Sequence, residues 1–256
     1  MPILGRSLLL PTAGALLLAS IGCNRRQTVA GECRAVHGAQ VCTWGETMAG
    51  QVVAFGATIP VMVADSAPAD MKMAWPPVAD AVIPLPAAVA QGTGFSEMTI
   101  FWEPHGHPPG AYLTPHFDFH FYGVPAAAVD AIDCADSTKP AALAAGYALP
   151  DADIPGVGHL VGICVPKMGM HALPAAELAS ANIFEKTMVV GYYHASPIFV
   201  EPMITQATLA ARKSFTLPLL DVPGRPAGTK YPTSFRADYD STAKAYRFVF
   251  EGMGGK

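Results

Sequence analysis

"PHFDFHFY" (Pro115–Tyr122) is the stretch that decides the fold, because histidine and aspartate alternate in it with phenylalanine. Alternate side chains of a β-strand lie on the same face of the sheet. One face of this strand therefore carries three aromatic rings that need a hydrophobic core, Phe117, Phe119 and Phe121. The opposite face carries His116, Asp118, His120 and Tyr122. A polar face of this kind must meet water, a lined cavity or a metal ion.

Short runs of β-branched and aromatic residues recur along the rest of the chain, between 24 prolines and 24 glycines that leave little room for long helices. Met98–Glu103, Thr187–Tyr193 and Ala245–Glu251 are examples of further predicted strands. Val124–Asp133 and Ala175–Phe184 are predicted as short helices. The sequence thus predicts a mainly β fold, a single-domain antiparallel β-barrel or sandwich with one or two short helices.

The N-terminus is typical of an exported protein. Residues 1–22 resemble a signal peptide, in which Arg6 precedes an apolar run that is too short for a convincing membrane span. "ASIGC" resembles a lipobox, so Cys23 would carry a lipid; simple secretion and an uncleaved anchor are the alternatives. We therefore expect a protein of the cell envelope or periplasm, with an N-terminal flank at 23–44 and one β-rich domain at 45–256.

Charge and motifs restrict the partners. Charged residues make up 14% of the chain and the net charge is −4, without a basic patch, so nucleic acid is not an expected partner. Contact with a membrane is expected only through the lipid anchor, and a homo-oligomer is compatible with the sequence. The sequence contains no G-x-S-x-G elbow, P-loop or H-E-x-x-H motif, so it indicates neither an enzymatic reaction nor a substrate.

Four cysteines remain besides Cys23, and an even number in an exported chain indicates two disulfides. Three pairings are possible. Proximity in the sequence favours Cys33 with Cys42 and Cys134 with Cys164. A zinc–thiolate site is the alternative, but the chain has no CxxC pair.

The histidines predict a metal site centred on the opening stretch. Neighbours two apart on a strand are about 6.6 Å apart and can share an ion, whereas residues four apart are separated by about 13 Å. A regular strand therefore provides His116 with Asp118, or Asp118 with His120. We expect the remaining ligands from elsewhere, with His171 and Glu201 best placed. Zinc, or another divalent metal, suits such a mixture of imidazole and carboxylate ligands.

Other interpretations of the same residues stay open. His105 and His107 belong to a connection between strands and are predicted at the rim of the site. A structural polar network and a metal-free catalytic or ligand-binding cleft compete with the metal site. The polar network corresponds to an alternative function without a metal, that of a non-enzymatic structural or stress-related assembly lipoprotein. Copper(I) could instead bind a thioether set with His171, namely Met71, Met73, Met168 and Met170.

The motifs together resemble a family of exported bacterial domains of unknown function that is named after a Thermus protein. The resemblance covers about Gly45 to Thr216 and rests on "WEPHGHP", "PHFDFHFY", "MGMH" and "EPMIT", of which the second and fourth are the most specific. An aromatic residue commonly follows the histidine equivalent to His171 in that family, whereas this chain has Ala172. The resemblance implies a β-rich, barrel-like fold that can oligomerise, and it implies no established reaction.

Overall fold

The computed structural model describes residues 25–72 and 74–253. The predicted signal peptide and the lipidation site at Cys23 lie outside these residues. The described residues form a mainly β structure in which every pair of neighbouring strands is antiparallel. This confirms the predicted fold class in its coarse form.

Two large sheets and one hairpin account for the strands. The order of the six-stranded sheet is β1 (Gln27–Val36), β2 (Ala39–Met48), β3 (Gln51–Pro60), β15 (Ala245–Glu251), β14 (Ser234–Asp240) and β13 (Phe215–Leu217). The order of the seven-stranded sheet is β4 (Ala81–Pro84), β5 (Glu97–Glu103), β6 (His116–Tyr122), β12 (Ser196–Thr205), β11 (Lys186–Tyr193), β10 (Met170–Pro174) and β7 (Tyr147–Ala148). The hairpin consists of β8 (Ala152–Ile154) and β9 (Gly158–Leu160).

Two details of the predicted fold are corrected. The described residues do not form a closed barrel, because both large sheets end in edge strands. They also contain five short α-helices rather than one or two: α1 (Met62–Asp65), α2 (Ala87–Thr93), α3 (Ala126–Asp130), α4 (Ala175–Leu178) and α5 (Gln206–Ala210). Two 3-10 turns, η1 (Gly110–Tyr112) and η2 (Val161–Ile163), complete the secondary structure.

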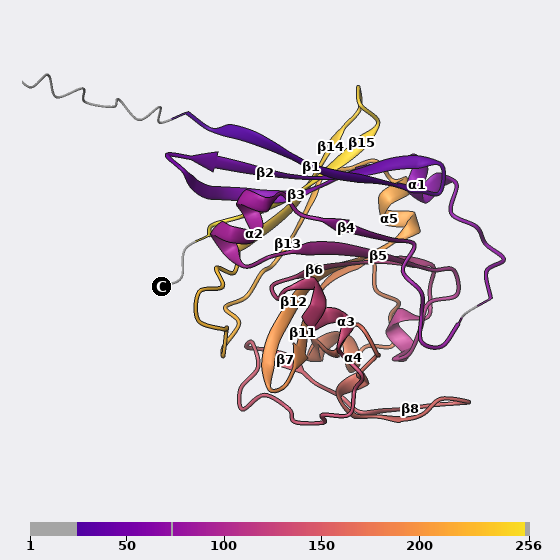
Figure 1. Cartoon of the computed structure of the whole chain (residues 1–256). Coiled ribbons are helices and arrows are strands. Elements are labelled where there is room, and N and C mark those ends of the chain that lie inside the picture. Colours follow the sequence, from indigo (N-terminus) through magenta and orange to yellow (C-terminus); the bar gives the residue numbers. More distant parts are fainter. Residues whose placement is uncertain (1–24, 73, 254–256) are drawn as a thin grey trace, which may run out of the picture.

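The core lies between the two large sheets, which are stacked in Figure 1. Its centre is the aromatic face of β6, whose rings meet rings of β15 across the interface. The ring centroids of Phe119 and Phe248 are 5.0 Å apart, and those of Phe121 and Phe250 are 4.8 Å apart. Burial of such rings is the main favourable term for a fold of this size.

The described part of the N-terminal flank expected at residues 23–44 contributes to the six-stranded sheet. It contributes β1 and the first half of β2, and β2 pairs with β3 through a register that includes Cys42 opposite Thr58. Val41 is fully buried in the main core. The first disulfide, Cys33–Cys42, joins β1 to β2, as proximity predicted.

Residues 123–169, which we call the cover segment, connect β6 to β10 and contribute one short strand, β7, to the edge of the seven-stranded sheet. They contain α3, β7, the β8–β9 hairpin and η2. In Figure 1 this segment lies on the side of the seven-stranded sheet that faces away from the six-stranded sheet. The second predicted disulfide, Cys134–Cys164, is confirmed and lies within the cover segment.

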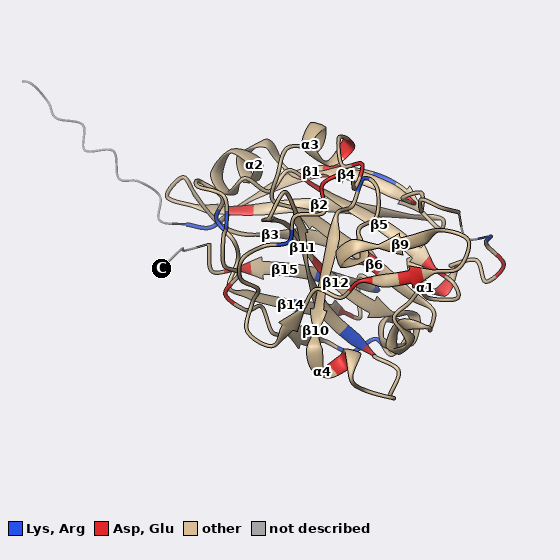
Figure 2. Cartoon of the chain, turned by 90° about the horizontal axis from the view of Figure 1, so that it is seen from below, with Lys and Arg blue, Asp and Glu red and all other residues tan. Residues whose placement is uncertain are grey.

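Charged residues are dispersed along the described part of the chain (Figure 2). Figure 2 shows lysine and arginine scattered around the molecule, with acidic residues between them. Among the described residues, no helix has the length and apolar character needed to cross a membrane.

Candidate metal centre

The polar face of β6 is buried almost as completely as its aromatic face. His116, Asp118 and His120 are each at most 5% exposed. Antiparallel pairing brings Glu103 of β5 opposite His116, and Met203 of β12 opposite Asp118. The cover segment closes over this face, so the polar side chains lie inside the protein rather than at a solvated sheet surface.

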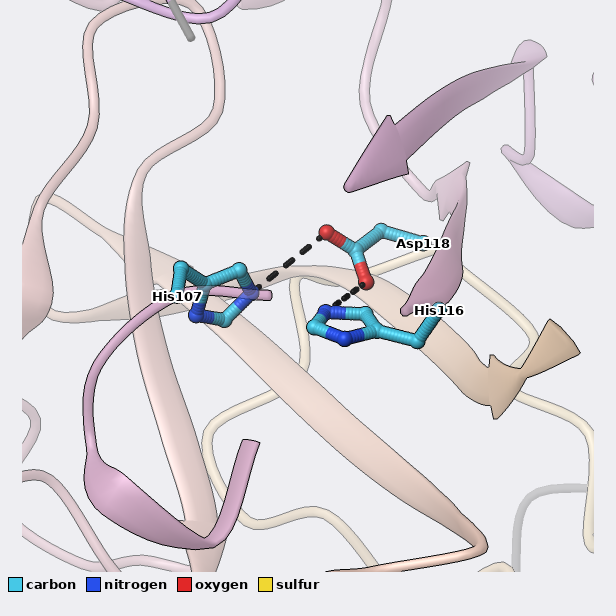
Figure 3. A group of neighbouring side chains, drawn as sticks. All are labelled: His107, His116 and Asp118. Atoms are coloured by element: carbon cyan, nitrogen blue, oxygen red, sulfur yellow. Dashed lines mark ion pairs between the residues drawn. The ribbon is translucent and has the colours of Figure 1, made fainter. Parts of the chain in front are cut away.

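Two groups of three side chains lie close enough together that each could hold a metal ion. The first consists of His107, His116 and Asp118, and the candidate ligand atoms within it lie within 4.8 Å of one another. His116 Nε2 is 3.2 Å from one Asp118 carboxylate oxygen, and His107 Nε2 is 3.5 Å from the other. Figure 3 shows the two rings approaching the carboxylate from different sides.

The second group consists of His120, His171 and Glu201, and its candidate ligand atoms also lie within 4.8 Å of one another. His120 Nε2 is 3.6 Å from Glu201 Oε2, and the ring centroids of His120 and His171 are 5.7 Å apart. Each group therefore offers two imidazoles and one carboxylate. The groups are adjacent, since Asp118 and His120 lie on the same face of the same strand.

Glycines allow the backbone to place these side chains. Gly106 has a φ of +66°, and a Cβ atom there would be 2.1 Å from the backbone oxygen of Tyr112, so only glycine fits the turn that brings His107 to the site. Gly191 of β11 leaves room for the ring of Phe199, which a Cβ atom would meet at 1.9 Å. That ring packs against His120 of the second group at 4.7 Å between centroids.

Backbone carbonyls orient three of the four histidines. The Nδ1 atoms of His107, His116 and His171 lie 2.9, 2.7 and 2.9 Å from the carbonyl oxygens of Pro108, Thr114 and Ile163, in that order. A carbonyl only accepts hydrogen bonds, so Nδ1 must donate, and Nε2 of the neutral ring keeps a lone pair. Metal-binding histidines in proteins are typically oriented by a hydrogen bond of this kind.

The Nε2 atom of His116 illustrates the consequence. With its hydrogen on Nδ1, the neutral ring has nothing to donate to the Asp118 oxygen 3.2 Å away, and a lone pair would face a carboxylate. A proton or a metal cation between the two atoms removes this repulsion.

Unpartnered polar atoms are concentrated in this region. Among the described residues, eleven buried side-chain nitrogen and oxygen atoms have no hydrogen-bond partner, and six of them lie here. They are Glu103 Oε2, His116 Nε2, Asp118 Oδ1, both ring nitrogens of His120, and Glu201 Oε2. Buried polar atoms without partners are uncommon in proteins and cost about 1–3 kcal/mol each. Their convergence indicates a site that is completed by a ligand.

Burial and charge set different protonation states in the two groups. Burial opposes ionisation of Asp118, but the imidazoles of His116 and His107 beside it hold its pKa well below the usual range. Burial, reinforced by the negative charge of Asp118, raises the pKa of Glu201 well above its usual range. Burial also lowers the pKa of His120 to about 3 and of His171 to about 4, so both imidazoles are neutral at pH 7, the form that binds metals.

Two further groups extend the site. Burial disfavours the charged form of His107, but hydrogen bonding to Asp118 and the charges of Asp118 and Glu103 raise its pKa to about 9. Glu103 lies beside the first group, opposite His116 on the neighbouring strand, and burial together with the charge of Asp118 raises its pKa to about 8. The negative charge of Asp118 is thus balanced by the cation of His107 when no metal is bound.

A cavity of about 470 Å³ opens directly above the two groups. The polar residues at its floor are Glu103, His107, Asp118, His171 and Glu201. His116 and His120 lie behind this layer and do not line the cavity. A metal ion held by either group would therefore be reachable from the cavity.

The structure brings all five predicted ligands together but divides them between two groups. Of the two residues expected at the rim, His107 belongs to the first group, whereas His105 is exposed and belongs to neither. Glu103 was missed, although the alternation in "EMTIFWE" (Glu97–Glu103) places it on the same face as Thr99 and Phe101.

The methionines do not point to a copper(I) site. Met168 packs with Phe101 and Val165 in a small apolar cluster, and Met170 belongs to the main core. Met71 is partly exposed on a different segment, and Met73 lies outside the described residues. Filling of gaps in the core accounts for the two buried thioethers.

Comparisons of this chain with protein-family models, with curated proteins and with solved structures gave no match. The resemblance to the family named after a Thermus protein therefore stays a prediction. The function has to be inferred from the geometry of the site itself.

Proposed function

We propose that this protein binds transition-metal ions at the two adjacent groups, and that its function is exerted through those ions. The observation that carries the proposal is the orientation of the rings: His107, His116 and His171 each donate Nδ1–H to a backbone carbonyl and leave Nε2 for a ligand. A structural polar network would instead satisfy its own atoms, whereas six buried polar atoms here have no partner.

Zinc is the ion that the donor set suits best. Two imidazoles and one carboxylate are a common set of protein ligands for zinc, with bond lengths of about 2.0–2.2 Å. Ions that prefer oxygen ligands, such as calcium and magnesium, are disfavoured by two imidazoles in each group. Iron(II) accepts the same donor set and is the competing ion.

The open coordination positions favour a catalytic or ligand-binding role over a purely structural one. Structural zinc sites are closed by four protein ligands, whereas catalytic sites use three and leave a position for water or substrate. Each group offers three, and four of the six residues line the cavity. A metal-bound water, which ionises near pH 7 on zinc, is the chemistry that such a site supplies.

The two disulfides indicate an extracytoplasmic protein, because such bonds persist in oxidising compartments. We propose a more specific location in the cell envelope, with Cys23 lipidated. We also propose that the two sheets form a β-sandwich with the metal centre on the face of the seven-stranded sheet that faces away from the six-stranded sheet. Mass spectrometry of the mature N-terminus tests the location: a lipidated Cys23 supports it, and an unmodified or uncleaved terminus contradicts it.

Metal analysis of the purified protein tests the metal sites. After loading with Zn²⁺ and removal of excess ion, we expect two zinc ions per chain. The His107→Ala and His120→Ala variants should each lose one ion. His105→Ala is the matched control, since His105 neighbours the site in sequence but belongs to neither group. A wild-type protein that retains no metal would contradict the proposal and favour the polar network.

A further inference from the structure

We infer that the cavity above the metal centre binds a small molecule with an apolar body and a single carboxylate, and that the carboxylate is held by the metal ions. This inference rests on the proposed function, since it needs metal at the two groups. It adds a class of ligand that the metal sites alone do not specify.

The walls of the cavity are apolar and come from three separate segments. The cover segment contributes the tip of the β8–β9 hairpin and the residues after it, the loop before β4 contributes Trp75, and the loop after β5 contributes two prolines. The main wall residues are Trp75, Pro108, Val157, Leu160, Ile163 and Met168. Apolar walls above a polar floor are typical of sites for small organic molecules.

The exposed rim of the cavity supports an apolar ligand. Trp75 is 44% exposed, although large apolar side chains are mostly buried elsewhere in the protein. Trp44 and Trp102, the other two tryptophans, are at most 5% exposed. A partly exposed indole at the mouth of a cavity provides apolar surface that a bound molecule would remove from water.

The size of the cavity fits one small molecule. Its volume of about 470 Å³ lies within the roughly 300–1,000 Å³ that is usual for ligand pockets. The space exceeds what metal-bound water requires, since one water occupies about 30 Å³ in the liquid. The cavity therefore accommodates an organic body in addition to the head group at the ions.

Charge selects the head group. None of the residues that line the cavity is a lysine or arginine, so the described walls offer neither of these side chains to pair with an anion. Two divalent ions would contribute four positive charges against at most three negative charges, from Glu103, Asp118 and Glu201. The loaded floor then has a net positive charge, which favours a monoanion and makes its binding dependent on the metal.

Octanoate, octanol and acetate are suitable probes for this inference. Octanoate has both parts of the proposed ligand, octanol has the apolar body without the charge, and acetate has the carboxylate without the body. Emission from Trp75 reports on occupancy, because a bound chain removes water from its indole; Trp75→Phe identifies its share of the signal. Zinc content is measured on every sample before the titrations.

We expect octanoate to bind the zinc-loaded protein at least about tenfold more tightly than octanol or acetate, and to lose about tenfold or more in affinity after zinc is removed. Val157→Asp should weaken octanoate binding by a similar factor with unchanged zinc content, because it adds a negative charge to the wall. Val157 lies in the hairpin turn and is only partly buried, so the fold tolerates the change. Val78→Asp is the matched control, at a 79% exposed position that does not line the cavity.

Several results would overturn the inference while leaving the metal sites intact. The zinc-loaded protein could fail to bind octanoate, or octanol could bind as tightly as octanoate. Val157→Asp and Val78→Asp could also lose affinity for octanoate equally. Octanoate that binds the zinc-free protein with full affinity would overturn it as well. A protein that takes up no zinc contradicts the proposed function itself, and the inference fails with it.

Discussion

On one face of β6, Phe117, Phe119 and Phe121 are fully buried against the six-stranded sheet, and on the other, His116, Asp118 and His120 are buried under the cover segment. On the aromatic face, each ring packs against other rings in the core. The polar face leaves hydrogen-bonding atoms without partners. Equal burial thus has opposite energetic consequences: the aromatic face stabilises the fold, whereas the polar face leaves hydrogen-bonding groups unpaired at a cost in stability.

The largest effect is expected on the aromatic face. Phe119→Ala should lower the free energy of unfolding by about 3–5 kcal/mol, because it removes a fully buried ring and leaves a cavity between the sheets. Urea denaturation measures this loss, and the zinc content of the folded fraction should not change. Val78→Ala, at an exposed position, should stay within about 0.5 kcal/mol of wild type. A loss below about 1 kcal/mol for Phe119→Ala would contradict the assignment of the core.

The next effect concerns the cover of the polar face. Replacement of both Cys134 and Cys164 by serine should cost about 3–4 kcal/mol, because the bond closes a loop with a sequence separation of 30. The equivalent change at Cys33 and Cys42, with a separation of 9, should cost about 2.5 kcal/mol. Only the first change should also weaken octanoate binding. If both double variants weakened octanoate binding equally, the Cys134–Cys164 bond would have no specific role in holding the cover segment over the site.

Metal should reverse part of the cost of the polar face. Free zinc at about one hundred times its dissociation constant should stabilise the folded protein by about 2.7 kcal/mol per site. Thermal unfolding with zinc and with a chelator measures this difference, which should be about half as large in His107→Ala. Identical melting temperatures with and without zinc would contradict the proposal that zinc binds at the unpartnered atoms.

The smallest effect separates the two carboxylates of the metal groups. Glu201 is kept protonated by burial, so Glu201→Gln should change the stability of the metal-free protein by less than about 0.5 kcal/mol. Asp118 is ionised beside His107 and His116, so Asp118→Asn should cost about 2 kcal/mol. Both variants should lose zinc. Urea denaturation of the two metal-free variants compares them, and equal losses of stability would show that the carboxylates share one protonation state.

Alternation in the sequence was sufficient to find the central strands. β6 and β15 occupy the predicted ranges, and β11 starts one residue earlier than predicted, because their buried residues recur where the sheet requires them. Proximity of the cysteines was sufficient for both disulfides. These features depend on residues that are close together in the sequence, so the sequence alone is enough to predict them.

Several strands were missed, and in two of them, β1 and β14, the apolar alternation is weak. β1 is an edge strand with only one buried residue, so its sequence shows no apolar alternation. β14 carries Arg236, which pairs with Glu251 of the neighbouring β15, and such cross-strand ion pairs replace the apolar signal. In both strands, partners distant in sequence determine the structure.

The ligand types of the candidate site were predictable, but their grouping was not. His171 and Glu201 were named from their residue types and positions near strand ends. The assignment of Glu201 to His120 depends on the register of β12 against β6, in which Met203 lies opposite Asp118 and thereby brings Glu201 to His120. His171 reaches the same group from β10, through its pairing with β11. His107 joins the first group through a turn at Gly106, which strand periodicity does not describe.

The position of the Cys134–Cys164 bond has a consequence for proteolysis. The β8–β9 hairpin tip, at the wall of the cavity, lies between the two cysteines in the chain. A protease that cuts this tip would leave two polypeptides that remain one covalent molecule until the bond is reduced. Nicked protein would therefore migrate as an intact chain on a non-reducing gel and as two fragments on a reducing gel.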